Sequence, residues 1–235
     1  MPVPITPISH ALCPYVRRVA IALLEKGVAF DRRTVALSHK PGWFLAISPL
    51  GRTPVLQAGD DVLLESAAIL EYLEETLPNP LHPQDHAERA RHRAWIGFGS
   101  NCLGDIAGFH SAGDAQTLDT RAATIHARFR VLEAHLGAGP WFAGTRFGFV
   151  DTVLAPAFRY FDTFDAIGDF GAFDGLTRVP AWRANLARRA SVQMAVEADY
   201  ANRLERFIER RGSALAHRLM ARRLRSALPD IAGAV

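Results

Sequence analysis

Cys13 is the residue of this chain best placed to do chemistry, because it directly precedes an amphipathic helix. Apolar residues recur after it at helical spacing, and Pro14 is favoured at the first helical position, where its missing N–H costs nothing. We therefore expect Cys13 to be the N-cap of a helix over residues 14–26. Unpaired backbone N–H groups and the positive end of the helix dipole would then favour the thiolate, which is the nucleophilic form.

No second thiol stands where it could resolve a disulfide formed on Cys13. A dithiol pair needs a cysteine three positions later, and Val16 occupies that place. A mixed disulfide on Cys13 must then be resolved by an external thiol, of which glutathione is the abundant cytosolic example. The only other cysteine, Cys102, is expected to be a small buried hydrophobic side chain.

Two further segments carry groups that could bind the ends of glutathione. We expect a cis peptide bond between Thr53 and Pro54, which would turn the Thr53 backbone outward to pair with a peptide ligand as an added strand. Glu65 and Ser66 precede another amphipathic stretch. The Ser66 hydroxyl and nearby backbone N–H groups can bind a carboxylate, and Glu65 can accept an ammonium. A carboxylate and an ammonium on one carbon form the γ-glutamyl end of glutathione.

The elements that position these residues alternate between strands and helices over residues 1–77. Gly27 is a good C-cap for the first helix, a hairpin turns at residues 58–61, and Ser66 is expected to cap the last helix of this part. The pattern predicts strands at 3–8, 29–35, 54–56 and 62–64 and helices at 14–26, 40–47 and 66–77. This order is a βαβ-ββα unit.

The composition changes after Leu77. Residues 78–84 hold three prolines and are typical of a stiff linker, and residues 85–235 have helical periodicity only. We expect an α+β protein with a domain at 1–77, a linker at 78–84 and an all-helical domain at 85–235. The basic run from His217 to Arg225 is expected to be a solvated terminal helix.

Bulk properties exclude several classes of function. With two cysteines there is no disulfide framework, which favours a reducing, cytoplasmic compartment. We find no signal peptide and no run long and apolar enough to span a bilayer. A net charge of +3 spread along the chain does not indicate nucleic-acid binding. His82, His86 and His92 lack the spacing of a zinc site, so we expect no metal.

The combination of these motifs resembles the glutathione transferase superfamily, in particular its cysteine-dependent, omega-like branch. The resemblance covers nearly the whole chain, and each motif is weak alone but specific in this order and spacing. It rests on Cys13-Pro14-Tyr15, Lys40-Pro41-Gly42-Trp43-Phe44, Ser48-Pro49-Leu50-Gly51-Arg52-Thr53-Pro54-Val55-Leu56, and Glu65-Ser66 followed by Glu71-Tyr72-Leu73.

The resemblance implies a thioredoxin-like N-terminal domain, a helical C-terminal domain and glutathione as co-substrate, usually in a homodimer. It implies that Cys13 forms a mixed disulfide with glutathione and that Tyr15 lines the site. The implied glutathione contacts are Pro14, Tyr15, Lys40 (to the glycyl carboxylate or nearby backbone), Thr53 (to the cysteinyl backbone), Pro54, and Glu65 and Ser66 (to the γ-glutamyl group).

The sequence of the helical part indicates fewer functional residues. The family usually opens a buried helix with a Ser/Thr-x-x-Asp capping box, but Gly148 stands in the N-cap place three residues before Asp151. Trp95, Phe98 and Phe109 are candidates for an acceptor pocket facing Cys13, although an aromatic stripe on a helix is more often core. Arg17 and Arg18 are expected on the polar face of the first helix.

Together these features predict a glutathione-dependent thiol transferase or reductase, including dehydroascorbate-type reduction, with a small electrophilic or disulfide acceptor. One alternative is a glutathione-dependent isomerase or dehalogenase of the same superfamily, although the Ser-Ser-Cys pattern of the isomerases is absent. Another is a non-catalytic partner protein on the same fold. Such proteins tend to lose the cysteine and the ligand motif, and this chain keeps both.

Overall fold

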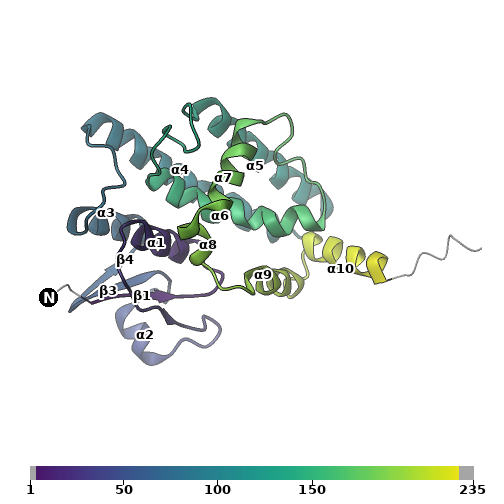
Figure 1. Cartoon of the computed structure of the whole chain (residues 1–235). Coiled ribbons are helices and arrows are strands. Elements are labelled where there is room, and N and C mark those ends of the chain that lie inside the picture. Colours follow the sequence, from purple (N-terminus) through teal and green to yellow (C-terminus); the bar gives the residue numbers. More distant parts are fainter. Residues whose placement is uncertain (1–3, 228–235) are drawn as a thin grey trace, which may run out of the picture.

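A four-stranded mixed sheet organises the first third of the chain. The computed structural model describes residues 4–227. The sheet has the order β2-β1-β3-β4, with β1 and β2 parallel and the other neighbours antiparallel (Figure 1). Pro7 lies opposite Leu56, and Val55 opposite Leu64. The strands are β1 (Ile5–Ser9), β2 (Arg33–Thr34), β3 (Val55–Ala58) and β4 (Asp61–Leu64).

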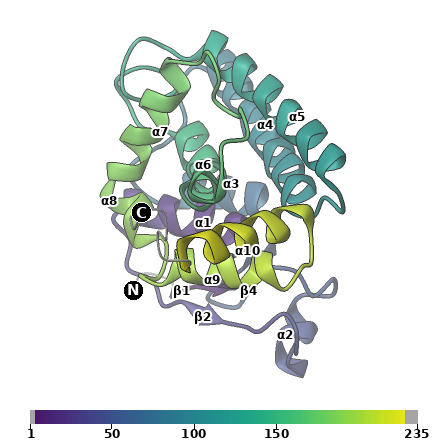
Figure 2. The ribbon, with the colours of Figure 1, turned by 90° about the vertical axis from the view of Figure 1, so that its right-hand side faces the viewer.

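Helices cover both faces of this sheet. The apolar stripe of α1 (Pro14–Glu25) buries Val19 and Leu23 completely, and α3 (Ser66–Thr76) packs beside α1. The other face is covered by α2 (Gly42–Ile47), whose buried Phe44 packs with Ile8 and Val55. Figures 1 and 2 show α2 on the side of the sheet away from the helical part.

The predicted boundaries hold well for the helices and less well for the strands. Gly27 follows α1 with a φ of +68°, a left-handed conformation that glycine adopts without strain. The strand expected at residues 29–35 is wrong in length, because only Arg33 and Thr34 pair with β1. Both of these residues are exposed, so little apolar burial holds a longer strand in the sheet.

The segment after α3 is tied down by a buried ion pair. The Lys26 ammonium donates to the Glu74 carboxylate at 2.8 Å, and neither side chain is more than 2% exposed. Glu74 also accepts the backbone N–H groups of Leu81 and His82, and Lys26 donates to the carbonyl oxygen of Asn79. The connection therefore runs over a fixed path between α1, α3 and the helical part.

The rest of the described chain is helical. A long, mostly buried central helix, α6, contacts α1 on one side and α4 on the other (Figures 1 and 2). The basic terminal run lies in the last helix, where His217, Arg223 and Arg225 are exposed. The helices are α4 (His86–His110), α5 (Ala115–His135), α6 (Phe149–Ile167), α7 (Arg178–Arg188), α8 (Ala190–Met194), α9 (Tyr200–Glu209) and α10 (Ala214–Ala227).

Asp151 fastens the start of α6. Its carboxylate accepts the backbone N–H groups of Gly148 and Phe142 and the indole N–H of Trp182, at 2.7 to 2.9 Å. The sequence predicts one half of the capping box, the bond from the N-cap N–H to the Asp151 carboxylate. That bond is present, and Gly148 is the N-cap. Burial raises the pKa of Asp151 to about 6, although these three donors act to lower it.

The two parts share one continuous core, and the fold class is confirmed.

Arg17 and Arg18 were expected on a solvated face of α1, but the structure corrects this, because they are 2% and 0% exposed. They face α6 and α9 rather than water, since α1 is enclosed by the helical part on this side. Between residues 4 and 227, no helix is long and apolar enough to cross a membrane.

Candidate functional site

A cavity of about 540 Å³ lies where the β1–α1 loop, the segment before β3 and the start of α3 meet. It brings together six of the predicted site residues from three separate stretches of sequence. Of the predicted set, Cys13, Tyr15, Thr53, Pro54, Glu65 and Ser66 line the cavity. Leu37, Arg52 and Ser100 are lining residues that the sequence did not single out.

Cys13 is the N-cap of α1, as predicted. Its backbone is extended, with φ −70° and ψ 115°, and its side chain makes no capping hydrogen bond, so the sulfur is not committed to the helix end. The thiol donates to the carbonyl oxygen of Thr53 at 3.5 Å, and its side chain is partly accessible. Pro14 begins the helix directly behind it. Cys13 is therefore a free thiol at the junction of two loops and open to a ligand.

The peptide bond between Thr53 and Pro54 is cis, as the sequence predicts. Thr53 is half-buried and its carbonyl faces the thiol of Cys13. Lys40 is exposed and not part of the cavity wall, but it lies against a lining residue, Gly51. A Cβ placed on Gly51 would lie 2.9 Å from the Lys40 Nζ, and the φ of +59° at Gly51 also favours glycine.

The start of α3 offers an uncapped helix N-terminus to the cavity. We expected Ser66 to be the cap, but Glu65 is the N-cap and Ser66 is the first helical residue. Glu65 has a φ of +65°, a left-handed conformation that is uncommon for a residue other than glycine. Its side chain makes no capping bond, so the first N–H groups of α3 are available to a ligand carboxylate.

Arg18 lies behind the wall of the cavity, a placement that the sequence did not indicate. Its guanidinium is buried, donates to Ser100 Oγ at 2.8 Å and to the Val153 carbonyl at 3.3 Å, and lies 4.8 Å from the ring centre of Tyr15. Burial lowers the pKa of Arg18 to about 10, and nearby Tyr15 and Cys13 act in the opposite direction. A permanent positive charge thus lies behind the cavity wall at neutral pH.

Tyr15 lines the cavity as a protonated phenol. Burial raises the pKa of Tyr15 above its usual value, and this outweighs the attraction of the Arg18 charge. Its hydroxyl is thus neutral at physiological pH. Tyr15 thus lies in the cavity wall beside Cys13, and its part in the chemistry stays a prediction.

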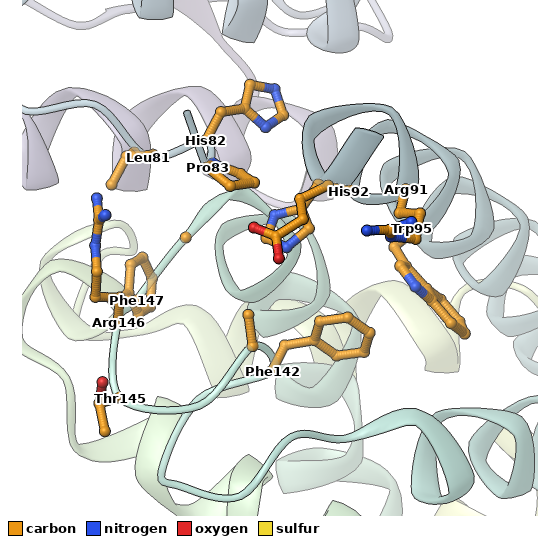
Figure 3. A pocket seen from close by; sticks show the side chains of 13 residues that line it. Leu81, His82, Pro83, Arg91, His92, Trp95, Phe142, Thr145, Arg146 and Phe147 are labelled. Atoms are coloured by element: carbon orange, nitrogen blue, oxygen red, sulfur yellow. The ribbon is translucent and has the colours of Figure 1, made fainter. Parts of the chain in front are cut away.

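The aromatic residues proposed for an acceptor pocket are not in the wall of the Cys13 cavity. Phe109 is 1% exposed and packs against Phe164 and Phe170 in the core. Trp95 packs against Phe98 and lines a different cavity, of about 370 Å³, between the start of α4 and residues 142–148 (Figure 3). The stripe on α4 turns these rings toward α5 and α6, so Ser100 is the residue of α4 that reaches the Cys13 cavity.

No group of three or more histidine, cysteine, aspartate or glutamate side chains in the described part of the chain is arranged to hold a metal ion. His82 and His92 lie close together, with ring centres 6.3 Å apart. Burial lowers the pKa of both rings. Cys102 is 2% exposed, and burial raises the pKa of its thiol to about 12, as expected for a buried hydrophobic side chain.

Comparison with known proteins agrees with this geometry. Two family models match, the glutathione S-transferase N-terminal domain over residues 12–76 and the C-terminal domain over residues 97–190. Glutathione S-transferase U22 of Arabidopsis thaliana is 31% identical over 162 residues, which cover 67% of this chain and 73% of that protein. The chain belongs to the glutathione S-transferase family. Its plant relatives here are of the tau class.

Solved structures of glutathione S-transferases have the same fold. Rice GST1 in complex with glutathione superposes with a TM-score of 0.78 at 25% identity, covering 88% of this chain and 96% of that one. Glutathione transferase Omega 3C from Trametes versicolor superposes with a TM-score of 0.71 at 25% identity, covering 83% and 90%. The chain therefore shares its fold with the omega-class structure and with the rice enzyme. Neither likeness alone assigns this chain to a class.

Proposed function

We propose that this glutathione S-transferase is a cysteine-dependent, omega-like thiol transferase or reductase, and that Cys13 is its catalytic residue. The observation that carries the proposal is the free thiol of Cys13 at an uncapped helix start, in the cavity that Glu65 and Ser66 also line. A thiol at this position can form a covalent bond to sulfur, which a hydroxyl cannot.

The reaction proceeds in two thiol–disulfide exchanges. The Cys13 thiolate attacks the glutathionyl sulfur of a mixed disulfide, forms a Cys13–glutathione disulfide and releases the acceptor as a thiolate that takes up a proton. The thiolate of a second glutathione then attacks the same glutathionyl sulfur. Glutathione disulfide leaves and Cys13 returns to the thiolate. One disulfide is reduced and one is formed, so electrons balance.

The other residues of the cavity hold glutathione in the first exchange. The N–H groups at the start of α3 and the Ser66 hydroxyl bind the γ-glutamyl carboxylate, and Glu65 accepts its ammonium. Thr53 pairs with the cysteinyl backbone, and Pro54 shapes the turn beside it. Lys40 attracts the glycyl carboxylate from its place over Gly51. Tyr15 completes the wall beside the sulfur, and Pro14 begins α1 directly behind it.

The proposal predicts opposite behaviour of the two cysteines. Cys13→Ser should lose reduction of a glutathione mixed disulfide and of dehydroascorbate by more than about 100-fold, because an alcohol forms no disulfide. Cys102→Ser serves as the control and should keep the rate. Intact-mass analysis after incubation with glutathione disulfide should show one glutathionyl group on wild type and none on Cys13→Ser. A full reduction rate in Cys13→Ser excludes the mechanism.

Conjugation of glutathione to an aryl electrophile is the second candidate function, favoured by the likeness to plant tau-class relatives. A serine hydroxyl can stabilise the thiolate of glutathione itself, so Cys13→Ser should gain conjugation as it loses reduction. An isomerase or dehalogenase would instead act on its own substrates with no glutathione adduct. A non-catalytic partner protein would show none of these activities.

A homodimer is also part of the proposal. The exposed apolar side chains Leu50, Val62 and Leu64, which are 70%, 40% and 38% exposed, lie at the loop before β3 and on the edge strand β4. A second copy that covers them would remove this apolar area from water. Light scattering should give twice the chain mass of 25.8 kDa, and Leu50→Asp should shift it toward the monomer. We place the enzyme in the cytoplasm.

A further inference from the structure

A cavity of about 260 Å³ shares no lining residue with the cavity at Cys13 or with the one beside Trp95. Its walls come from the end of β1 and the loop that follows, from the first turn of α1, from β2 and the residue before it, and from the segment between α8 and α9 together with α9 itself. Its polar lining is rich in positive charge, supplied by Arg17, Arg32 and Arg203. None of these residues is used by the proposed reaction.

Arg17 is a buried cation without a counterion. The residue is 2% exposed, and its guanidinium lies between two tyrosines, 5.3 Å from the ring centre of Tyr160 and 4.6 Å from that of Tyr200. All three guanidinium nitrogens lack a hydrogen-bond partner within residues 4–227. Both aromatic rings attract the cation, but among the described residues no carboxylate forms an ion pair with Arg17, so no negative charge offsets it directly.

The remaining charges around the cavity nearly cancel one another. Arg203 donates to Asp199 at 2.7 Å, so this pair is neutral as a unit. Arg32 donates to the carbonyl of Ala195 at 3.3 Å, and Glu197 is the one acidic lining residue. Burial lowers the pKa of Arg32, and the charge of Glu197 acts against that. The charge left over is that of Arg17, in the inner wall.

We propose that this cavity binds a small anion that carries a phosphate, sulfate or carboxylate group. Arg32 and the free N–H groups of Arg203 would hold the anion from the rim, and Arg17 would attract it from the inner wall through a medium of low dielectric constant. The volume admits a small metabolite and not a polymer. The site is separate from that of glutathione, so the proposal does not depend on the reaction at Cys13.

Calorimetric titration of the full chain with inorganic phosphate, at constant ionic strength and without glutathione, tests the proposal. We expect saturable binding that Arg32→Gln weakens at least about tenfold. Glu197→Gln should strengthen binding at least about threefold, because it removes the acidic charge from the cavity. Sulfate and succinate titrations then show whether a tetrahedral oxyanion or a carboxylate is preferred.

The control is Arg206→Gln, which removes one positive charge from an exposed position on α9 outside the cavity and should leave binding unchanged. Arg17→Met should abolish binding; if it does not fold, the two rim variants still decide. Absence of saturable binding of all three anions to the wild type would overturn the proposal. So would equal affinity in wild type, Arg32→Gln and Glu197→Gln, because binding would then not involve this cavity.

Discussion

Arg18 connects the reactive loop to the helical part through a single side chain. It donates to Ser100 on α4 and to the backbone of Val153 on α6, and its guanidinium lies near the ring of Tyr15. Because the arginine charge is buried, it acts on a negative charge at Cys13 with little screening by solvent. We regard Arg18 as a positioning residue whose buried charge is placed to attract negative charge at the reacting sulfur.

Replacing Arg18 should therefore slow chemistry at Cys13 more than it weakens glutathione binding. Arg18→Met is expected to lower kcat for disulfide reduction about tenfold with a smaller change in KM, and Arg18→Lys should recover part of the loss. The rate of Cys13 alkylation by iodoacetamide in folded protein should fall in parallel. An unchanged alkylation rate would restrict Arg18 to a purely structural role.

At the residue scale, the sequence predicts a site residue correctly when its role depends only on its neighbours along the chain. Cys13 at a helix start and the cis bond before Pro54 depend on neighbours in the sequence, and the structure has both. Arg17 and Arg18 were misplaced because their partners lie on α6 and α9, far along the chain. Helical periodicity tells which residues share a face, but not that a second domain covers the polar one.

At the scale of elements, the Lys26–Glu74 pair joins α1, α3 and the connection to the helical part. Both side chains are almost fully buried, and Glu74 accepts two backbone N–H groups besides the ammonium. Burial acts to raise the pKa of Glu74, but these hydrogen bonds outweigh it and the net shift is downward. The carboxylate is thus ionised in the folded protein and needs its counterion.

Lys26→Met should destabilise the fold by about 3–5 kcal/mol, because it leaves a carboxylate buried without its cation. Urea unfolding measures this loss. Arg218→Met is the matched control, since its pair with Asp119 is exposed and should contribute less than about 1 kcal/mol. The double variant Lys26→Met, Glu74→Gln should lose less than the sum of the single losses; additive losses would mean that the two residues act independently.

The elements themselves were predicted to different degrees. The amphipathic helix α1 buries a stripe that the sequence shows directly, and it forms where expected. The pattern at residues 29–35 predicted a strand, but only two residues pair, because the pairing partner and the burial come from the assembled sheet. Ser66 is the first residue of α3 and not its N-cap. Serine is compatible with both positions, so the sequence did not distinguish them.

At the scale of the whole molecule, one hydrophobic core runs from Ile5 in β1 to Leu219 in α10 and includes both parts of the chain. A second, small cluster lies under α2 on the far face of the sheet. The two parts are also joined by a polar contact, in which Arg189 and Ser191 donate to the Glu25 carboxylate. We infer that the parts fold as one cooperative unit, so that a buried group in either of them changes the stability of the whole.

Asp151 makes that stability depend on pH. Its folded pKa of about 6 lies above the usual aspartate value of 3.8, so the folded state binds the proton more tightly than the unfolded state. The stabilisation is therefore fully present at low pH and is lost as the pH rises through about 6. Buried His110 has the opposite effect, because burial lowers its pKa to about 4 and folding then opposes protonation.

Asp151→Asn isolates the carboxylate from the other titrating groups. The variant loses a hydrogen bond at every pH, since an amide cannot accept from all three donors, and this constant cost is about 1–3 kcal/mol. The stability advantage of wild type over Asp151→Asn should be larger at pH 4.5 than at pH 7.0 by about 2 kcal/mol. Urea unfolding at the two pH values measures it. An advantage that grows toward pH 7.0 would mean that the three donors outweigh burial and that Asp151 is ionised throughout.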